Sequence, residues 1–291
     1  MQSNYMFLQK SDYVWINDGF VAWEEAKVHI MTHALHYSST VFEGIRSYNG
    51  QIFEAESHAK RLINSAKLLE MEIKYDYTQI VQLLDDTVKK NNLSDSYIRP
   101  LIWRGDEEMK LYSDKLSTNF LIAAWPISSG KSASLNIDIS RWKKFSPETF
   151  PTNCKAGATY SMMSKVKIES LRNGFDDSLL LDIDGNIAEC TCANIFFVKD
   201  NTLYTPNITH ILNGITRQTI IDLAKNLNCN VIEKNIHPNE LDNFQECFIT
   251  GTAVEIIPIS TITRNDNKIS FNESTITDIL MNNYHDLVRK K

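Results

Sequence analysis

Apolar residues recur every three to four positions in two stretches of the N-terminal third, and this spacing is typical of amphipathic helices. The stretches span residues 56–70 and 77–90, so we expect a helix in each. Asp76 and Gln79 form a capping-box pattern that predicts where the second helix begins.

Short apolar runs and turn dipeptides predict strands around these helices. Residues 97–103 and 120–125 have the composition of strands, and Asn17-Asp-Gly19 and Asn49-Gly50 are hairpin turns. Residues 33–46 lie between the hairpins and show no sustained period. They are aromatic, small and charged, which is typical either of a loop that lines a site or of a packed loop.

A polar, glycine-bearing segment at residues 128–134 has the composition of a linker. We therefore expect a small N-terminal α/β domain at residues 1–127 and a larger domain at residues 135–291. In the larger domain strands outnumber helices, which predicts an α+β chain whose second domain is β-barrel-like with outer helices. The strands expected there are 135–140, 178–183, 194–198, 231–236 and 246–250, and the helices are 156–173, 215–227 and 273–288.

Composition and charge narrow the class of protein. The 291 residues are 43% hydrophobic with a net charge of -6, which argues against a general nucleic-acid binder. No signal peptide or membrane-spanning run is present, so we expect neither a membrane partner nor export. An odd number of cysteines, five, favours reduced thiols and a cytoplasmic location. Cys190 and Cys192 lack a second pair at zinc spacing and are expected to be small buried residues, so we expect no metal site.

Lys155 is the central candidate for chemistry. It follows a proline-punctuated entry and precedes Ala156, Gly157 and Ala158, and small residues allow a planar ligand to approach the backbone. Burial would favour the neutral, nucleophilic amine. We interpret Lys155 as the residue that holds pyridoxal phosphate as an imine. The alternative is a solvated surface lysine.

Two glycine- and threonine-bearing loops are candidates for binding a phosphate. Residues 213–217 precede a predicted helix, whose exposed N–H groups favour an anion, and residues 250–253 follow a strand. Arg61 could supply positive charge. Either loop could equally be an ordinary turn.

Glu189 and Arg99 are the remaining candidates. Glu189 lies in an apolar stretch, where a protonated ring nitrogen would keep it ionised; the alternative is a glutamate facing water. Arg99 and Tyr97 share one strand face and could bind a substrate carboxylate, or Arg99 could form a structural ion pair.

Taken in order, these segments resemble the class IV (fold type IV) pyridoxal-phosphate enzymes, and specifically the bacterial branched-chain amino-acid aminotransferase family. The resemblance spans nearly the whole chain. It is carried by Ala34-Leu-His-Tyr37, Val41-Phe42-Glu-Gly44-Ile-Arg46, Tyr97-Ile-Arg99-Pro100-Leu, Lys155-Ala-Gly, Gly214-Ile215-Thr216-Arg217 and Gly251-Thr252-Ala253-Val-Glu255. It implies a site between the two domains and a homodimer or higher homo-oligomer.

The resemblance also implies how the cofactor is held. Lys155 would form the imine and move the proton. Tyr160 would bind the phenolic oxygen of the cofactor and Glu189 its ring nitrogen. The phosphate would be held by Arg61, Ile215, Thr216 and Thr252.

The resemblance implies that the substrates are an L-amino acid and a 2-oxo acid. The amino group of leucine, isoleucine or valine would be transferred to 2-oxoglutarate. The α-carboxylate would contact Tyr97, Thr252 and Ala253. Arg99 would meet the distal carboxylate of glutamate. The apolar walls would be Phe42, Gly44 and Tyr37, the last from a partner subunit.

The chain departs from the family pattern near the substrate pocket. Cysteines replace glycines after Glu189, Ala193 replaces a second glutamate, and Ile127 replaces a tryptophan. Asn213 stands where proline is usual, and the loop around Asp106 is more charged. Three alternatives remain: a D-amino-acid transaminase, an aminodeoxychorismate-type lyase and a non-catalytic pyridoxal-phosphate-binding protein.

Overall fold

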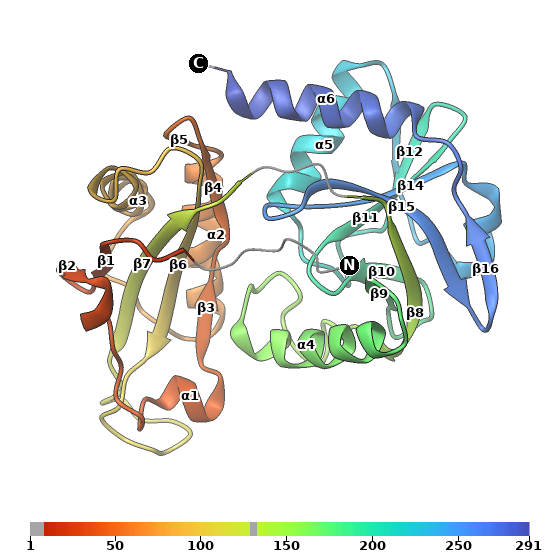
Figure 1. Ribbon diagram of the computed structural model, residues 1–291. Coiled ribbons are helices and arrows are strands. Elements are labelled where there is room, and N and C mark those ends of the chain that lie inside the picture. Colours follow the sequence, from red (N-terminus) through yellow and green to blue (C-terminus); the bar gives the residue numbers. More distant parts are fainter. Residues whose placement is uncertain (1–8, 129–132, 291) are drawn as a thin grey trace. The chain divides into compact units, whose positions relative to one another are not determined.

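The computed structural model describes residues 9–128 and 133–290 (Figure 1). The predicted linker at residues 128–134 falls largely on residues 129–132, which lie outside the described residues. Contacts divide the chain into two compact units. The first comprises Met1–Gly130 with Cys154–Ala158, and the second comprises Lys131–Asn153 with Thr159–Lys291. The short segment that contains Lys155 therefore packs with the N-terminal unit.

The first unit is a seven-stranded sheet with helices. Its sheet runs in the order β2-β1-β7-β6-β4-β5, with β3 paired to β6. Helices α2 and α3 pack against each other, and α3 also packs against β1, β6 and β7. The elements are β1 (Tyr13–Ile16), β2 (Gly19–Ala22), η1 (Trp23–Glu25), α1 (His33–Tyr37), β3 (Thr40–Phe42), β4 (Ile45–Tyr48), β5 (Gln51–Ile52), α2 (Ala55–Leu68), α3 (Tyr77–Lys90), β6 (Ser96–Arg104) and β7 (Thr118–Pro126).

Alternation along β6 and β7 assigns their side chains to the two faces of this sheet. The even-numbered residues from Ser96 to Ile102 are buried, as are Phe120, Ile122 and Ala124 on β7. Register pairs Tyr97 with Trp125 and Arg99 with Ala123, so these four side chains project from the opposite face.

The second unit is a nine-stranded sheet that curls back on itself. Its order is β10-β9-β8-β15-β14-β11-β12-β13, with β16 paired to β15. The elements are β8 (Leu135–Lys143), α4 (Gly157–Arg172), β9 (Asp177–Leu181), β10 (Ile187–Cys190), β11 (Asn194–Lys199), β12 (Thr202–Thr205), α5 (Ile215–Asn226), β13 (Asn230–Glu233), η2 (Pro238–Asn243), β14 (Glu246–Gly251), β15 (Glu255–Arg264), β16 (Asn267–Ser270) and α6 (Thr275–Arg289). Ile187 on β10 donates its N–H to the carbonyl of Ile236, just beyond β13, at 2.8 Å. This bond joins the two ends of the strand order, which makes the unit barrel-like.

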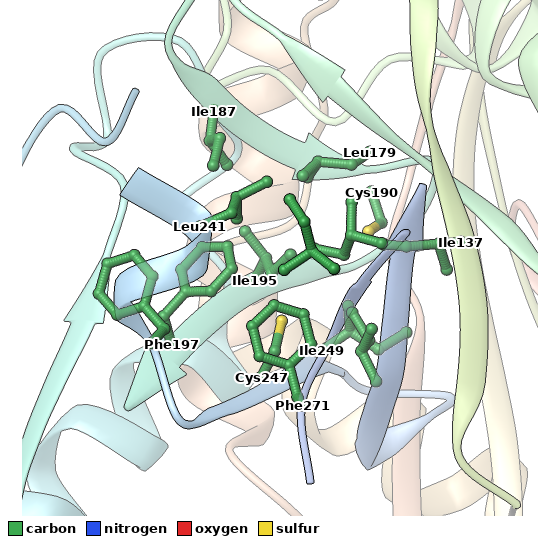
Figure 2. Close-up of a cluster of buried hydrophobic side chains, with 14 of the residues drawn as sticks. Ile137, Leu179, Ile187, Cys190, Ile195, Phe197, Leu241, Cys247, Ile249 and Phe271 are labelled. Atoms are coloured by element: carbon green, nitrogen blue, oxygen red, sulfur yellow. The ribbon is translucent and has the colours of Figure 1, made fainter. Parts of the chain in front are cut away.

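An apolar core fills the curled sheet. Ile137, Leu179, Ile195 and Ile249 come from four different strands and meet Phe197 in one cluster (Figure 2). Helices α5 and α6 pack outside, against β14. The predicted α+β class with a barrel-like second region is thus confirmed.

Most predicted elements are present, and two of the elements that were not predicted, β15 and α1, were missed for physical reasons. The two hairpin turns occur at Asn17 and Asn49, both with positive φ. Strand β15 was not predicted, because Pro258 interrupts its apolar pattern and proline lowers the expectation of a strand. Helix α1 was missed because five residues are too few for a visible period. Among the described residues, no helix is long and apolar enough to cross a membrane.

Candidate active site

The backbone of Lys155 is fixed between a strand and a helix of the first unit. Its carbonyl accepts from the Phe42 N–H at 3.1 Å, and its own N–H donates to Ser65 Oγ at 3.0 Å. Ala156 forms an isolated bridge with Val41 and is fully buried. The amine lies 5.1 Å from the centre of the Phe42 ring, within cation–π range. The small residues after Lys155 thus allow close packing of the main chain against β3.

Behind this segment lies a buried charged cluster that the sequence did not predict. Both Glu43 oxygens accept from Arg61, with Nε at 2.6 Å and Nη2 at 2.8 Å, and His58 Nδ1 lies 2.8 Å from Glu43. Burial would raise the pKa of the Glu43 carboxyl, but the adjacent Arg61 guanidinium holds that pKa well below its usual range. Arg61, the predicted phosphate-binding cation, is therefore oriented by a fully buried carboxylate.

Burial also sets the state of His58. The apolar surroundings lower the pKa of the imidazole, and this effect outweighs the attraction of Glu43. His58 is consequently neutral at pH 7 and holds the carboxylate by a hydrogen bond rather than by full charge.

The predicted substrate residues of the first unit form one group on the face of the sheet that carries Tyr97 and Arg99. Arg99 donates to the Tyr97 hydroxyl at 3.2 Å and lies over the Phe42 ring, 4.5 Å from its centre. A Cβ on Gly44 would overlap the Tyr97 hydroxyl, so glycine is required for this arrangement. Lys155, Phe42, Tyr97, Arg99 and Gly44 are thereby connected in a single cluster.

Tyr37 is placed differently. It lies on α1, is exposed, and donates its hydroxyl to the carbonyl of Met109 at 3.1 Å. The exposed phenol ring is therefore accessible to a partner subunit.

In the second unit, Glu189 is buried on β10 and held by two donors. Lys144 Nζ forms an ion pair with Oε1, and Asn194 Nδ2 donates to Oε2 at 3.0 Å. Asn194 also donates to the carbonyl of Leu212 at 3.0 Å, which ties Glu189 to the loop that precedes α5. The predicted alternative, a glutamate facing water, is wrong, because Glu189 is only 6% exposed.

Both predicted phosphate loops meet at Asn194. Gly214 is so close to Asn194 Oδ1 that a Cβ would overlap it. Asn194 pairs in register with Thr250, directly before the turn that holds Thr252 and Ala253. Ile215 and Thr216 are the first residues of α5, so the N–H groups of its first turn lie at this end of the unit. The second unit thus brings a buried carboxylate and the two loops that were predicted to bind a phosphate together.

Arg217 and Tyr160 lie in the first turns of α5 and α4, respectively. Arg217 is almost fully buried and anchors the start of α5 through Glu233 at 2.6 Å and the Pro206 carbonyl at 2.9 Å. Tyr160 is partly buried in the first turns of α4.

These features match a known family of enzymes. The family model Amino-transferase class IV matches residues 40–262. The chain belongs to the class IV aminotransferases. A probable branched-chain-amino-acid aminotransferase of Rickettsia typhi is 46% identical over 95% of this chain and 96% of its own length. The branched-chain-amino-acid aminotransferase of Escherichia coli K12 is 39% identical over 88% of this chain and 87% of its own.

Solved class IV aminotransferases share the fold. The Escherichia coli branched-chain enzyme superposes with a TM-score of 0.91 at 36% identity, covering 97% of this chain and 96% of that one. The enzyme from Thermobaculum terrenum, solved in its pyridoxal-phosphate form, gives 0.89 at 33% identity and covers 96% and 95%. The resemblance drawn from the motifs is confirmed.

The residues of this class IV aminotransferase fit pyridoxal phosphate. Lys155 supplies a primary amine whose main chain is fixed on both sides. Glu189 is a buried carboxylate that would suit a protonated ring nitrogen, and the N–H groups of the loops at Gly214 and Gly251 would suit a phosphate.

The positioning residues Lys144, Asn194, Glu43 and His58 were not among the predicted site residues. A lysine after a strand and a histidine inside a helix are common, and only the fold shows what they contact. The expectation of no metal site stays a prediction: Asp182, Asp184 and His210 each place a potential ligand atom within 4.8 Å of the others.

Proposed function

We propose that this chain transfers the amino group of L-leucine, L-isoleucine or L-valine to 2-oxoglutarate, giving branched 2-oxo acids and L-glutamate. The observation that carries this is the cluster of Lys155, Phe42, Tyr97 and Arg99, which combines an amine, apolar rings and a cation. An apolar wall beside a cation can accept both a leucine-like side chain and the distal carboxylate of glutamate.

Residues of both units would bind the cofactor. Arg61, Ile215, Thr216 and Thr252 bind its phosphate, Tyr160 its phenolic oxygen and Glu189 its ring nitrogen. When bound, the cofactor's protonated ring accepts the electron pair left when the Cα–H bond of the substrate breaks. Once the amino group of the substrate has displaced it from the cofactor, the free Lys155 Nζ would take that proton from Cα as general base and then deliver it as general acid.

The chain's other residues position the substrate. Tyr97, Thr252 and Ala253 bind the α-carboxylate, Phe42 and Gly44 wall the apolar part, and Arg99 meets the distal carboxylate. The first product leaves before the second substrate binds, so the kinetics are ping-pong.

We also propose a homodimer, or a larger assembly of dimers, in which Tyr37 of the partner subunit contributes to each site. Ile30 and Leu35, next to Tyr37, are 76% and 64% exposed. Large apolar side chains grouped at a surface favour association. A monomeric mass for the native protein in sedimentation would contradict this. The location we propose is cytoplasmic, which the five free cysteines support.

An assay of substrate choice tests the proposal. We expect turnover of L-leucine with 2-oxoglutarate to exceed that of D-alanine by more than about 100-fold, since a pocket of fixed handedness loses several contacts with the wrong enantiomer. Conversion of aminodeoxychorismate in place of leucine would support the lyase alternative. Preference for D-alanine would support the D-amino-acid transaminase.

A further inference from the structure

Trp125 on β7 is a buried tryptophan whose polar atom lacks an acceptor. Its side chain is 8% exposed, and no acceptor among the described residues bonds its Nε1–H. Buried indole N–H groups usually have a partner, because an unmet donor costs the full desolvation of that group. An acceptor from a ligand would satisfy it.

Trp125 projects from the face of the sheet that carries the substrate cluster. It pairs in register with Tyr97, and the two rings lie 5.1 Å apart. Arg99 pairs with Ala123 on the same face, and its guanidinium lies 5.4 Å from the centre of the Tyr97 ring. Trp125 and Arg99 therefore both pack against Tyr97.

Arg99 has an unmet donor as well. Its Nε is buried and makes no hydrogen bond to any described residue, although Nη2 donates to the Tyr97 hydroxyl. Two buried donors, one of them charged, lie around one tyrosine. A ligand group that matches such a pair is an anion that can accept several hydrogen bonds. A carboxylate has these properties.

We propose that Trp125 is a specificity-determining residue whose indole N–H donates to the distal carboxylate of glutamate or 2-oxoglutarate, beside Arg99. The proposal rests on the function proposed above. The side chains of leucine, isoleucine and valine have no acceptor, so they gain only apolar contact with the ring. Trp125 therefore acts on the dicarboxylate half of the reaction and not on the branched-chain half.

The test compares two unreactive acids on the holoenzyme by calorimetry. Glutarate carries the distal carboxylate and 4-methylvalerate carries an apolar branch instead. In Trp125→Phe, we expect the Kd of glutarate to rise on the order of 10-fold, as for loss of a hydrogen bond to a charged group. The Kd of 4-methylvalerate should change by less than about twofold. Trp15→Phe, a buried tryptophan on the opposite face of the sheet, is the control and should change neither.

Equal changes for both acids, or no change for glutarate, would overturn the proposal. A second measurement does not depend on the variant folding. In native ¹⁵N-labelled holoenzyme, the indole N–H signal of Trp125 should shift with glutarate and not with 4-methylvalerate, and the other four Trp→Phe variants assign it by elimination. An unmoved signal contradicts the role of Trp125 alone. A native protein that transaminates neither leucine nor glutamate contradicts the proposed function itself.

Discussion

At the scale of single residues, Gly44 and Tyr97 show how a motif becomes a site. The absence of a side chain at Gly44 leaves room for the Tyr97 hydroxyl, which accepts from Arg99. The sequence indicated both residues through the resemblance, but it could not show that one exists to accommodate the other. Glu189 was likewise predicted as a site residue from the sequence. Lys144, which forms an ion pair with Glu189, was not predicted.

We expect Gly44→Ala to displace the Tyr97 hydroxyl and to raise the KM for leucine on the order of 10-fold, about 1.4 kcal/mol. The added methyl cannot be accommodated while Tyr97 stays in place. Gly19→Ala is the matched control, because a Cβ there meets no atom within 4 Å. Steady-state kinetics of both variants check this, and equal KM values would show that the close approach is unimportant.

At the scale of elements, the sequence predicted features that depend on neighbouring residues, but it did not predict contacts between distant segments. Helix α3 has the predicted bounds, and its start is fixed by the expected capping box of Asp76 and Gln79. By contrast, the packing of Cys154–Ala158 with the first unit depends on bonds to Phe42 and Ser65, which are distant in sequence. Contacts between distant segments produce no periodic pattern in the sequence from which they could be predicted.

The ion pair between Lys144 and Glu189 links the end of β8 to β10, and its loss should destabilise the second unit. Lys144→Met leaves a buried carboxylate without its cation, so we expect a loss of about 3 kcal/mol in the free energy of unfolding. Lys144→Arg should retain most of that stability.

Lys143→Met is the matched control for this prediction. Lys143 is exposed, and its side chain donates to the Ile183 carbonyl instead of pairing with a buried carboxylate. We expect a change within about 0.5 kcal/mol there. Chemical denaturation of the three variants measures the difference. Similar losses for Lys144→Met and Lys143→Met would show that the buried pair contributes nothing specific.

At the scale of the whole molecule, the α+β class and the barrel-like second sheet followed from the count and spacing of strands. The bond that joins its ends, from Ile187 to Ile236, could not be predicted, since register between distant segments is set by the packed core. The buried cluster of Glu43, His58 and Arg61 likewise ties global stability to pH.

We expect stability to fall as pH drops below about 6.5, the ordinary pKa of histidine. The folded-state pKa of His58 is lowered, so the unfolded chain takes up a proton that the folded chain refuses. The lowered pKa of Glu43 adds a further loss below about pH 4.5. His58 should account for about 1 kcal/mol between pH 7.5 and 5.5.

His58→Asn removes this titration and should flatten the dependence of unfolding free energy on pH in that range. His285→Asn, on an exposed helix surface, should keep the native slope. Thermal and denaturant unfolding at several pH values compare them. A native slope in His58→Asn would mean that other groups control the acid response.

The most direct measurement is the half-reaction followed by absorbance. Purified protein reconstituted with pyridoxal phosphate is mixed with L-leucine alone, without a 2-oxo acid. We expect the spectrum of the aldehyde form to convert to that of the amino form and 2-oxoglutarate to reverse this conversion. Lys155→Ala should show neither change. An unchanged spectrum in the native protein, or normal conversion in Lys155→Ala, would contradict the account.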